Sequence, residues 1–296
     1  MTLLRHYGGL MIAGCFFGTI SIFSALLRDQ GVSSFQQAFF RSFLALPLIL
    51  FTCHAYNIKI ALPKNQLIPY ILLGMVMAGV GFFENTAVAL GTPVAVVVLL
   101  LYTQPVWTAL FGTLFLHEFI NHRKKLAVIM AFGGMILISK VWNITYTNYP
   151  GMLLALIAGV LLSGEFIMIK NLSVQPHHFL VSIFWFYVFR TVFTVPLGTL
   201  SGFLSDNVLI SQVTLSLPVE EWVTLFLFAL VPMVLGMVFF YRSVKHVSII
   251  STGIIMLIEP VSGIIYGIFI LGELIDSIVV TGGILILLAS ILVIKK

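Results

Sequence analysis

Five ionisable side chains lie inside long apolar stretches of this sequence, where charge is rare: Arg41, Glu84, Glu165, Arg190 and Glu259. An arginine in such a place can receive a carboxylate or a phosphate through two parallel hydrogen bonds. A glutamate there can hold an ammonium group or carry a proton, because apolar surroundings favour its neutral form. The alternative is structural. The arginines could form ion pairs with Glu84 or Glu165 or satisfy backbone carbonyls, and for at least one arginine we favour this interpretation.

Two prolines follow polar residues at matching positions, in the pairs Gln104-Pro105 and Glu259-Pro260. A proline inside a helix leaves the carbonyl one turn earlier without its partner and bends the helix. The pattern therefore predicts a helix break at each proline, with a polar side chain beside it that can face a cavity. A neutral Glu259, hydrogen-bonded to a neighbouring helix so that it holds the bend, is the alternative.

Four aromatic residues flank these polar positions, namely Tyr102 and Trp107 around Gln104, and Trp185 and Tyr187 before Arg190. Their rings could stack on an aromatic or cationic solute. We favour the simpler interpretation, in which they anchor the helices in the protein interior or at the membrane surface. The 26 phenylalanines mostly fill helix contacts or face lipid.

The elements that position these side chains are membrane helices. Of 296 residues, 60% are hydrophobic and 8% are charged, and the mean hydropathy is +1.14; soluble domains carry about 25% charged residues. A membrane helix needs about 20 mostly apolar residues. Ten such runs occur, at about 8–27, 35–54, 66–88, 92–113, 124–141, 150–170, 178–200, 222–243, 247–270 and 276–294. The net charge of +5 is therefore no sign of nucleic-acid binding.

The sequence also contains an internal duplication. An offset of 155 residues aligns Pro105, Gly112 and Glu118 with Pro260, Gly267 and Glu273, and an offset of 149 aligns Arg41 with Arg190. We expect a first five-helix repeat over 1–146 and a second over 147–296. Because five is odd, the two repeats must cross the membrane in opposite directions. Glu84 and Glu165 have no acidic counterpart, and such breaks in symmetry are where selectivity or ion coupling is expected.

Positive residues indicate the orientation. With the N-terminus in the cytoplasm, the outer segments hold only Arg28 and Lys140, and the inner segments hold Arg5, Lys59, Lys64, Arg123, Lys124, Lys125, Lys170, Arg242, Lys245, Lys295 and Lys296. Eleven against two predicts that both termini are cytoplasmic. Inverted repeats are the building plan of many secondary transporters, in which the substrate site lies near the midplane.

The order of these features resembles the drug/metabolite transporter superfamily, in particular its ten-span EamA-type members. The resemblance covers the whole chain and is carried by Arg41, the stretch 87–95, Pro105 with Glu118, Glu259-Pro260 and Gly272-Glu273. It implies two inverted five-helix repeats around a central cavity that opens to one side at a time, and a solute such as an amino acid, another metabolite or a drug, often carried outward. Since the Glu-Pro pair resembles a feature of relatives with different cargoes, we favour a role in architecture or gating over one in selectivity. Gln104 departs from the acid expected before the first proline, so the cargo does not carry over.

These features favour a secondary or facilitative transporter that moves a small metabolite by alternating access. A channel or a non-transporting scaffold is the alternative, although the sparse polar residues make no continuous stripe. A membrane enzyme acting on lipid comes last, because no cluster of catalytic or metal-binding residues appears. We expect no cofactor, metal or nucleic-acid partner, and no Walker-type loop for ATP occurs. We expect a monomer or homodimer in a prokaryotic cytoplasmic membrane, with proton coupling and simple exchange equally compatible.

Overall fold

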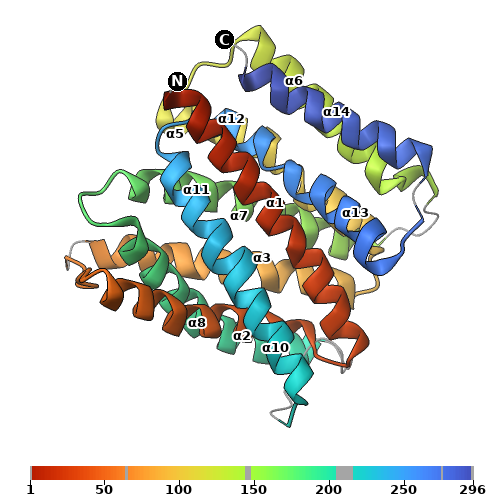
Figure 1. Cartoon of the computed structure of the whole chain (residues 1–296). Helices are drawn as coiled ribbons and strands as arrows, with labels where there is room; N and C mark the ends of the chain where they lie inside the picture. The colour runs from red at the N-terminus through yellow and green to blue at the C-terminus, as the bar shows by residue number, and fades with distance from the viewer. Residues whose placement is uncertain (1, 64–65, 144–147, 205–215, 275, 295–296) are drawn as a thin grey trace.

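The computed structural model gives the chain a helical architecture (Figure 1) and describes residues 2–63, 66–143, 148–204, 216–274 and 276–294, in which no strand occurs. Ten segments within these ranges are long and apolar enough to cross a membrane. This confirms the predicted ten spans, and the predicted span ends differ from the observed ones by at most five residues. Lys64, Lys295, Lys296 and the predicted boundary between the repeats lie outside the described residues.

Seven spans are single helices and three are interrupted. The single helices are α1 (Thr2–Asp29), α2 (Ser34–Ala55), α3 (Leu67–Ala89), α6 (His122–Ser139, followed by the short η2, Val141–Asn143), α7 (Tyr149–Ser173), α8 (Phe179–Leu204) and α14 (Ser277–Ile294). Span four consists of α4 (Val94–Leu101) and α5 (Gln104–Leu116), and span nine of α12 (Ile249–Ile255) and α13 (Ile258–Leu271). Span eight consists of α10 (Val219–Phe228), the π-helical η3 (Ala229–Gly236) and α11 (Met237–Val244).

Side-chain caps fix where several helices begin. Ser33, Asn121, Asn148 and Ser248 each accept a hydrogen bond from a backbone N–H in the first turn of the helix that follows. Such caps satisfy donors that the helix itself leaves unpaired, which matters more next to lipid than in water. The connections from α1 to α2 and from α3 to α4 are short turns. Gly31 and Gly91 both adopt a left-handed conformation that suits glycine.

Because the number of spans is even, α1 begins and α14 ends on the same side of the membrane (Figure 1). We call this side the terminal side and the opposite side the far side. On the far side the Lys140 ammonium lies 2.7 Å from the Asp276 carboxylate and joins the end of α6 to the start of α14. The hydrogen bond from Lys140 holds the pKa of Asp276 below its usual value.

The helix contacts repeat when each span is exchanged for the one five places away. For example, α3 packs on α7 and α8, and span eight correspondingly packs on α1 and α2. Spans five and ten, α6 and α14, pack on each other along one edge of the molecule (Figure 1). There Gly134 and Gly282 lie against each other: a Cβ on either would come within 2.7 Å of the other's carbonyl oxygen. Small residues of this kind let membrane helices approach closely.

Spans four and nine are each interrupted directly before their polar-proline pair. The backbone leaves the helix at Tyr102 and Thr103 in span four, and at Met256 and Leu257 in span nine. The π-helical stretch in span eight surrounds Pro232 and has no counterpart in α3. A wider helical turn of this kind frees backbone carbonyls inside the membrane, where they need another donor.

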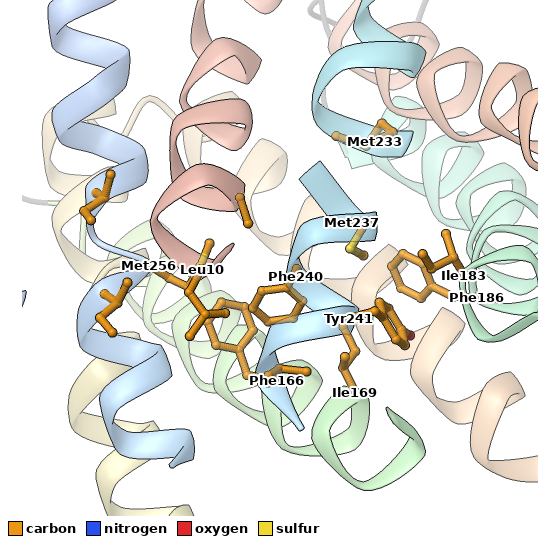
Figure 2. Close-up of a cluster of buried hydrophobic side chains, with 14 of the residues drawn as sticks. Leu10, Phe166, Ile169, Ile183, Phe186, Met233, Met237, Phe240, Tyr241 and Met256 are labelled. Atoms are coloured by element: carbon orange, nitrogen blue, oxygen red, sulfur yellow. The ribbon is translucent and has the colours of Figure 1, made fainter. Parts of the chain in front are cut away.

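Large apolar side chains fill the terminal half of the interior. Figure 2 shows Leu10, Phe166, Phe240 and Met256 packed together, next to Tyr241, Met237 and Phe186. Most of these residues are 5% exposed or less, and Phe166 is 7% exposed. They come from α1, α7, α8, span eight and span nine, so side chains from both halves of the sequence fill one core.

Candidate functional site

The five ionisable residues come from five different spans and converge on one place. Each lies within electrostatic range of at least two of the others. Arg41 interacts with Glu84 and Glu259, and Glu165 interacts with Arg190. Two arginines and three acids therefore share one interior region, as the sequence hypothesis for a central site requires.

No direct ion pair joins these five residues. Three ion pairs occur in the described part of the chain, and all three involve other residues. The buried Arg41 Nε has no hydrogen-bond partner, and its guanidinium carbon lies 5.3 Å from the centre of the Phe228 ring. Arg190 is 4% exposed and its Nη1 makes a long contact of 3.8 Å to the Met233 sulfur. The arginines therefore keep donors that a solute anion can use.

A cavity of about 30 Å³ lies between α2, α3 and α8 and reaches both arginines. Its lining also includes Asn85 and Thr194, and it extends from the middle of these helices towards their far ends. The volume suits about two water molecules. A larger solute therefore needs the surrounding helices to move apart. Sequence reasoning did not identify Asn85 or Thr194 as lining residues, although Asn85 directly follows Glu84.

The two helix breaks meet through Tyr102 and Glu259. The Tyr102 hydroxyl, at the break in span four, is within hydrogen-bonding reach of the Glu259 carboxyl in the first turn of α13. The matching residue Gln104 has a different environment, since it is 1% exposed and its side chain donates to Thr108. Thr108 in turn bonds to Ser163 of α7 at 3.0 Å. Glu259 therefore faces the cluster, whereas Gln104 bonds within span four to Thr108, and Thr108 links span four to α7.

The other three aromatic candidates have their polar atoms bonded within the protein. The Trp185 indole donates to the carbonyl of Ile60 at 2.8 Å, and the Trp107 indole donates to Thr103 at 3.0 Å. The Tyr187 hydroxyl donates to the carbonyl of Met233 at 2.9 Å, inside the π-helical stretch. These bonds agree with the anchoring interpretation, and Tyr187 supplies the donor that the widened helix needs.

These contacts predict that Trp185→Phe weakens the fold and spares the site. Loss of one hydrogen bond should cost about 1 kcal/mol, seen as a modest fall in Tm. Solute affinity should stay unchanged, because the indole points to the 56–63 connection. Tyr102→Phe is the contrasting variant, since it removes the hydroxyl next to Glu259 and should weaken binding. Equal loss of affinity in both variants would show that Trp185 contacts the solute.

The contacts of span eight with the two arginines were not predicted from the sequence. Phe228 lies over Arg41, and Met233 contacts both Arg190 and Tyr187. Pro232 was the available signal, because a proline inside an apolar run predicts an irregular helix. In the widened turn around this proline, the Met233 carbonyl meets the Tyr187 hydroxyl and the Met233 sulfur meets Arg190.

No metal site is indicated in the described ranges, where no three His, Cys, Asp or Glu side chains cluster in a way that could hold an ion. The His177 ring instead bonds to Tyr70 at 2.8 Å and to Ser182 at 2.9 Å on the terminal side. Burial lowers the pKa of His177, so the ring is neutral at pH 7. It serves to join the start of α8 to α3.

Comparison with known proteins gives a consistent result. The model of the EamA-like transporter family matches the chain twice, over residues 6–140 and 149–295. The pseudopaline exporter CntI of Pseudomonas aeruginosa, in strains UCBPP-PA14 and PAO1, is 24% identical over 286 residues, which cover 96% of this chain and 94% of the exporter. A solved crystal structure has the same fold, with a TM-score of 0.76 at 15% identity over 97% of this chain and 95% of that one.

Proposed function

Because this chain belongs to the EamA-like transporter family and is a membrane transporter, we propose that it carries a small zwitterionic metabolite, such as an amino acid or a related compound, by alternating access. The observation that supports this most strongly is the interior cluster of two arginines and three acids without a direct ion pair between them. A buried charge without a partner is costly. A solute that brings both a carboxylate and an ammonium group would complement both signs of charge at once.

In this proposal the guanidinium groups receive the carboxylate. Arg41 and Arg190 both border the cavity, and a planar fork of donors matches the two oxygens of a carboxylate. The acids Glu84 and Glu259 lie within electrostatic range of Arg41 and would hold the ammonium group or a coupling proton. Glu165, beside Arg190, would take the same part from the other half of the protein.

The repeated contacts between spans support an inverted-repeat mechanism. Spans four and nine are broken at equivalent places, and spans five and ten form a matching pair. Two similar halves can exchange conformations and thereby open the same site to either side of the membrane. The excess of Lys and Arg supports a cytoplasmic terminal side. The similarity to an exporter supports outward transport.

Counterflow into proteoliposomes tests the cargo. A zwitterionic amino acid loaded inside should drive uptake of the labelled compound, whereas its amide, without the carboxylate, and its N-acetyl form, without the ammonium, should fail. Glu84→Gln should reduce exchange about 10-fold, the loss expected of one charge-assisted hydrogen bond. Glu220→Gln is the matched control, because Glu220 is exposed at the start of α10.

Three results would contradict the proposal. Equal exchange of the amide or the N-acetyl form would remove the role of the charge cluster. Flux that never saturates with concentration would indicate a channel. Purified protein that binds zwitterions but shows no counterflow would indicate a non-transporting receptor. Collapse of a pH gradient during exchange distinguishes proton coupling from simple exchange.

A further inference from the structure

Glu118 connects three spans on the terminal side. It follows α5, and its carboxylate accepts backbone N–H bonds from Ile249 at 2.7 Å and Ile250 at 3.4 Å, where α12 begins. The same carboxylate accepts a bond of 3.0 Å from Lys170 at the end of α7. The Lys170 ammonium also donates to the carbonyl of Val247. One ion pair thus holds α5, α7 and α12 together.

This pair is the most shielded of the three ion pairs in the described ranges. The Glu118 side chain is 15% exposed and the Lys170 side chain 18%, whereas the other pairs are 31% to 73% exposed. Partial burial reduces screening by solvent and salt. Gly112 brings the helices close enough for these bonds, because a Cβ there would lie 2.6 Å from the Ile249 side chain. The close contact between α5 and α12 therefore depends on a glycine in α5 and on backbone N–H groups of α12.

Glu273, the duplicated counterpart of Glu118 on the far side, is exposed to solvent. It follows α13 as Glu118 follows α5, with its carboxylate over Gly267 of its own helix. No hydrogen bond from α4 to Glu273 occurs among the described residues, and α13 makes no packing contact with α4 like that between α5 and α12. The two ends of the molecule thus differ at equivalent residues.

The apolar core and the cavity also differ between the terminal side and the far side. The large apolar side chains Phe166 and Phe240 of Figure 2 lie in the terminal halves of α7 and span eight, and along α7 Phe166 comes between Glu165 and Lys170. The cavity at Arg41 and Arg190 extends from the middle of the helices towards the far side. Buried side chains therefore fill the terminal half of the core, and a hollow of about 400 Å³ lies at the terminal surface, where Tyr7, Lys124 and Ser248 line it.

From this asymmetry, and on the basis of the proposed transport function, we propose that Glu118 and Lys170 form the gate that closes the terminal end of the path. Opening that end requires α12 to leave the Glu118 carboxylate. In the opposite state Glu273 takes the corresponding place at the start of α4. No base assists it there, because the alignment of Glu165 with Thr19 sets Ser24 opposite Lys170. The terminal-closed state is then favoured without solute.

Distances between spin labels test the gate without any transport assay. One pair of labels at Phe119 and Lys245 reports the terminal side, and the duplicated positions Leu274 and Leu90 report the far side. All four residues are exposed, and the native Cys15 and Cys53 are replaced by alanine. In lipid nanodiscs without solute, Glu118→Gln and Lys170→Met should each lengthen the terminal distance, raising the open-to-closed ratio about 10-fold. Glu273→Gln is the matched control: because Glu273 is engaged only in the opposite state of the proposal, this variant should not lengthen the terminal distance and should leave the terminal-closed state at least as favoured as in the wild type.

The gate is overturned if the terminal distance stays unchanged in both folded variants. Of these, Lys170→Met leaves the Glu118 backbone bonds intact, whereas Glu118→Gln weakens them. An equal effect of Glu273→Gln would also overturn the gate. Size-exclusion profiles establish folding for every variant, and Lys170→Arg should keep the wild-type distance. A shift in distance without any counterflow would leave the gate standing and remove the proposed transport of a zwitterion.

Discussion

Arg190→Gln is expected to abolish measurable counterflow and to weaken binding of a zwitterionic solute at least 100-fold. Each hydrogen bond to a charged group is worth about 1.5–3 kcal/mol, and a guanidinium can make two of them to one carboxylate. Arg190 borders the cavity and is 4% exposed, with no carboxylate bonded to it in the described part of the chain. Its donors are therefore free for the solute. Binding is measured by calorimetry on the purified protein.

The same substitution distinguishes function from structure through its effect on stability. If Arg190 were a structural lock, Arg190→Gln would lower Tm along with affinity. Because the guanidinium makes only the weak sulfur contact at 3.8 Å, we expect Tm without solute to stay the same or rise. Arg190→Lys keeps the charge but loses the fork, and should lie between the two. Arg28→Gln, at a side chain 64% exposed, is the control and should change nothing. A large fall in Tm with unchanged affinity would contradict the carboxylate role.

The spans could be predicted from sequence because the requirement for a membrane helix is local. About 20 apolar residues between polar turns suffice to define one, so the ten segments appear without knowledge of their neighbours. The interruptions before Pro105 and Pro260 are local as well, since proline removes a donor from its own helix. The duplication adds long-range information of one kind: it indicates which spans are equivalent.

The residues of the candidate site could be predicted from the sequence, but their contacts could not. Charged residues in apolar runs had to lie inside the protein, but their partners depend on helix packing across the two halves. Whether Arg41 meets a carboxylate or the Phe228 ring depends on how span eight packs on α2, which no periodic pattern encodes. Gln104 and Glu259 occupy equivalent positions in sequence and differ in contacts, because Gln104 meets Thr108 and Glu259 meets Tyr102.

Glu118 shows the same limit. The duplication pairs it with Glu273, which suggests one role for both residues. A carrier in one state cannot treat both alike, because one end is closed while the other is not. Sequence symmetry therefore identifies gate residues in pairs, and only the packing of α5 on α12 shows which of the two is engaged.

Gly74→Ala is expected to destabilise the membrane interior and to disturb the candidate site together. A Cβ at Gly74 of α3 would come 2.7 Å from the backbone nitrogen of Arg190 and 2.7 Å from the backbone carbonyl carbon of Phe189 in α8, and closer still to the Phe189 Cβ. Backbone atoms cannot rotate away, so α3 and α8 must separate. Overpacking costs about 1–3 kcal/mol, and separation here also displaces Arg190 from the cavity.

Gly81→Ala on the same helix is the matched control. A Cβ at Gly81 has no other atom within 4 Å, so the substitution should be neutral or stabilising by up to about 1 kcal/mol from helix propensity. Both variants make the same chemical change, seven residues apart. Tm in detergent should therefore fall for Gly74→Ala and hold or rise for Gly81→Ala. If the two variants had equal Tm, the close packing of α3 on α8 would not limit stability, and the position of Arg190 would depend on other contacts, such as those with span eight.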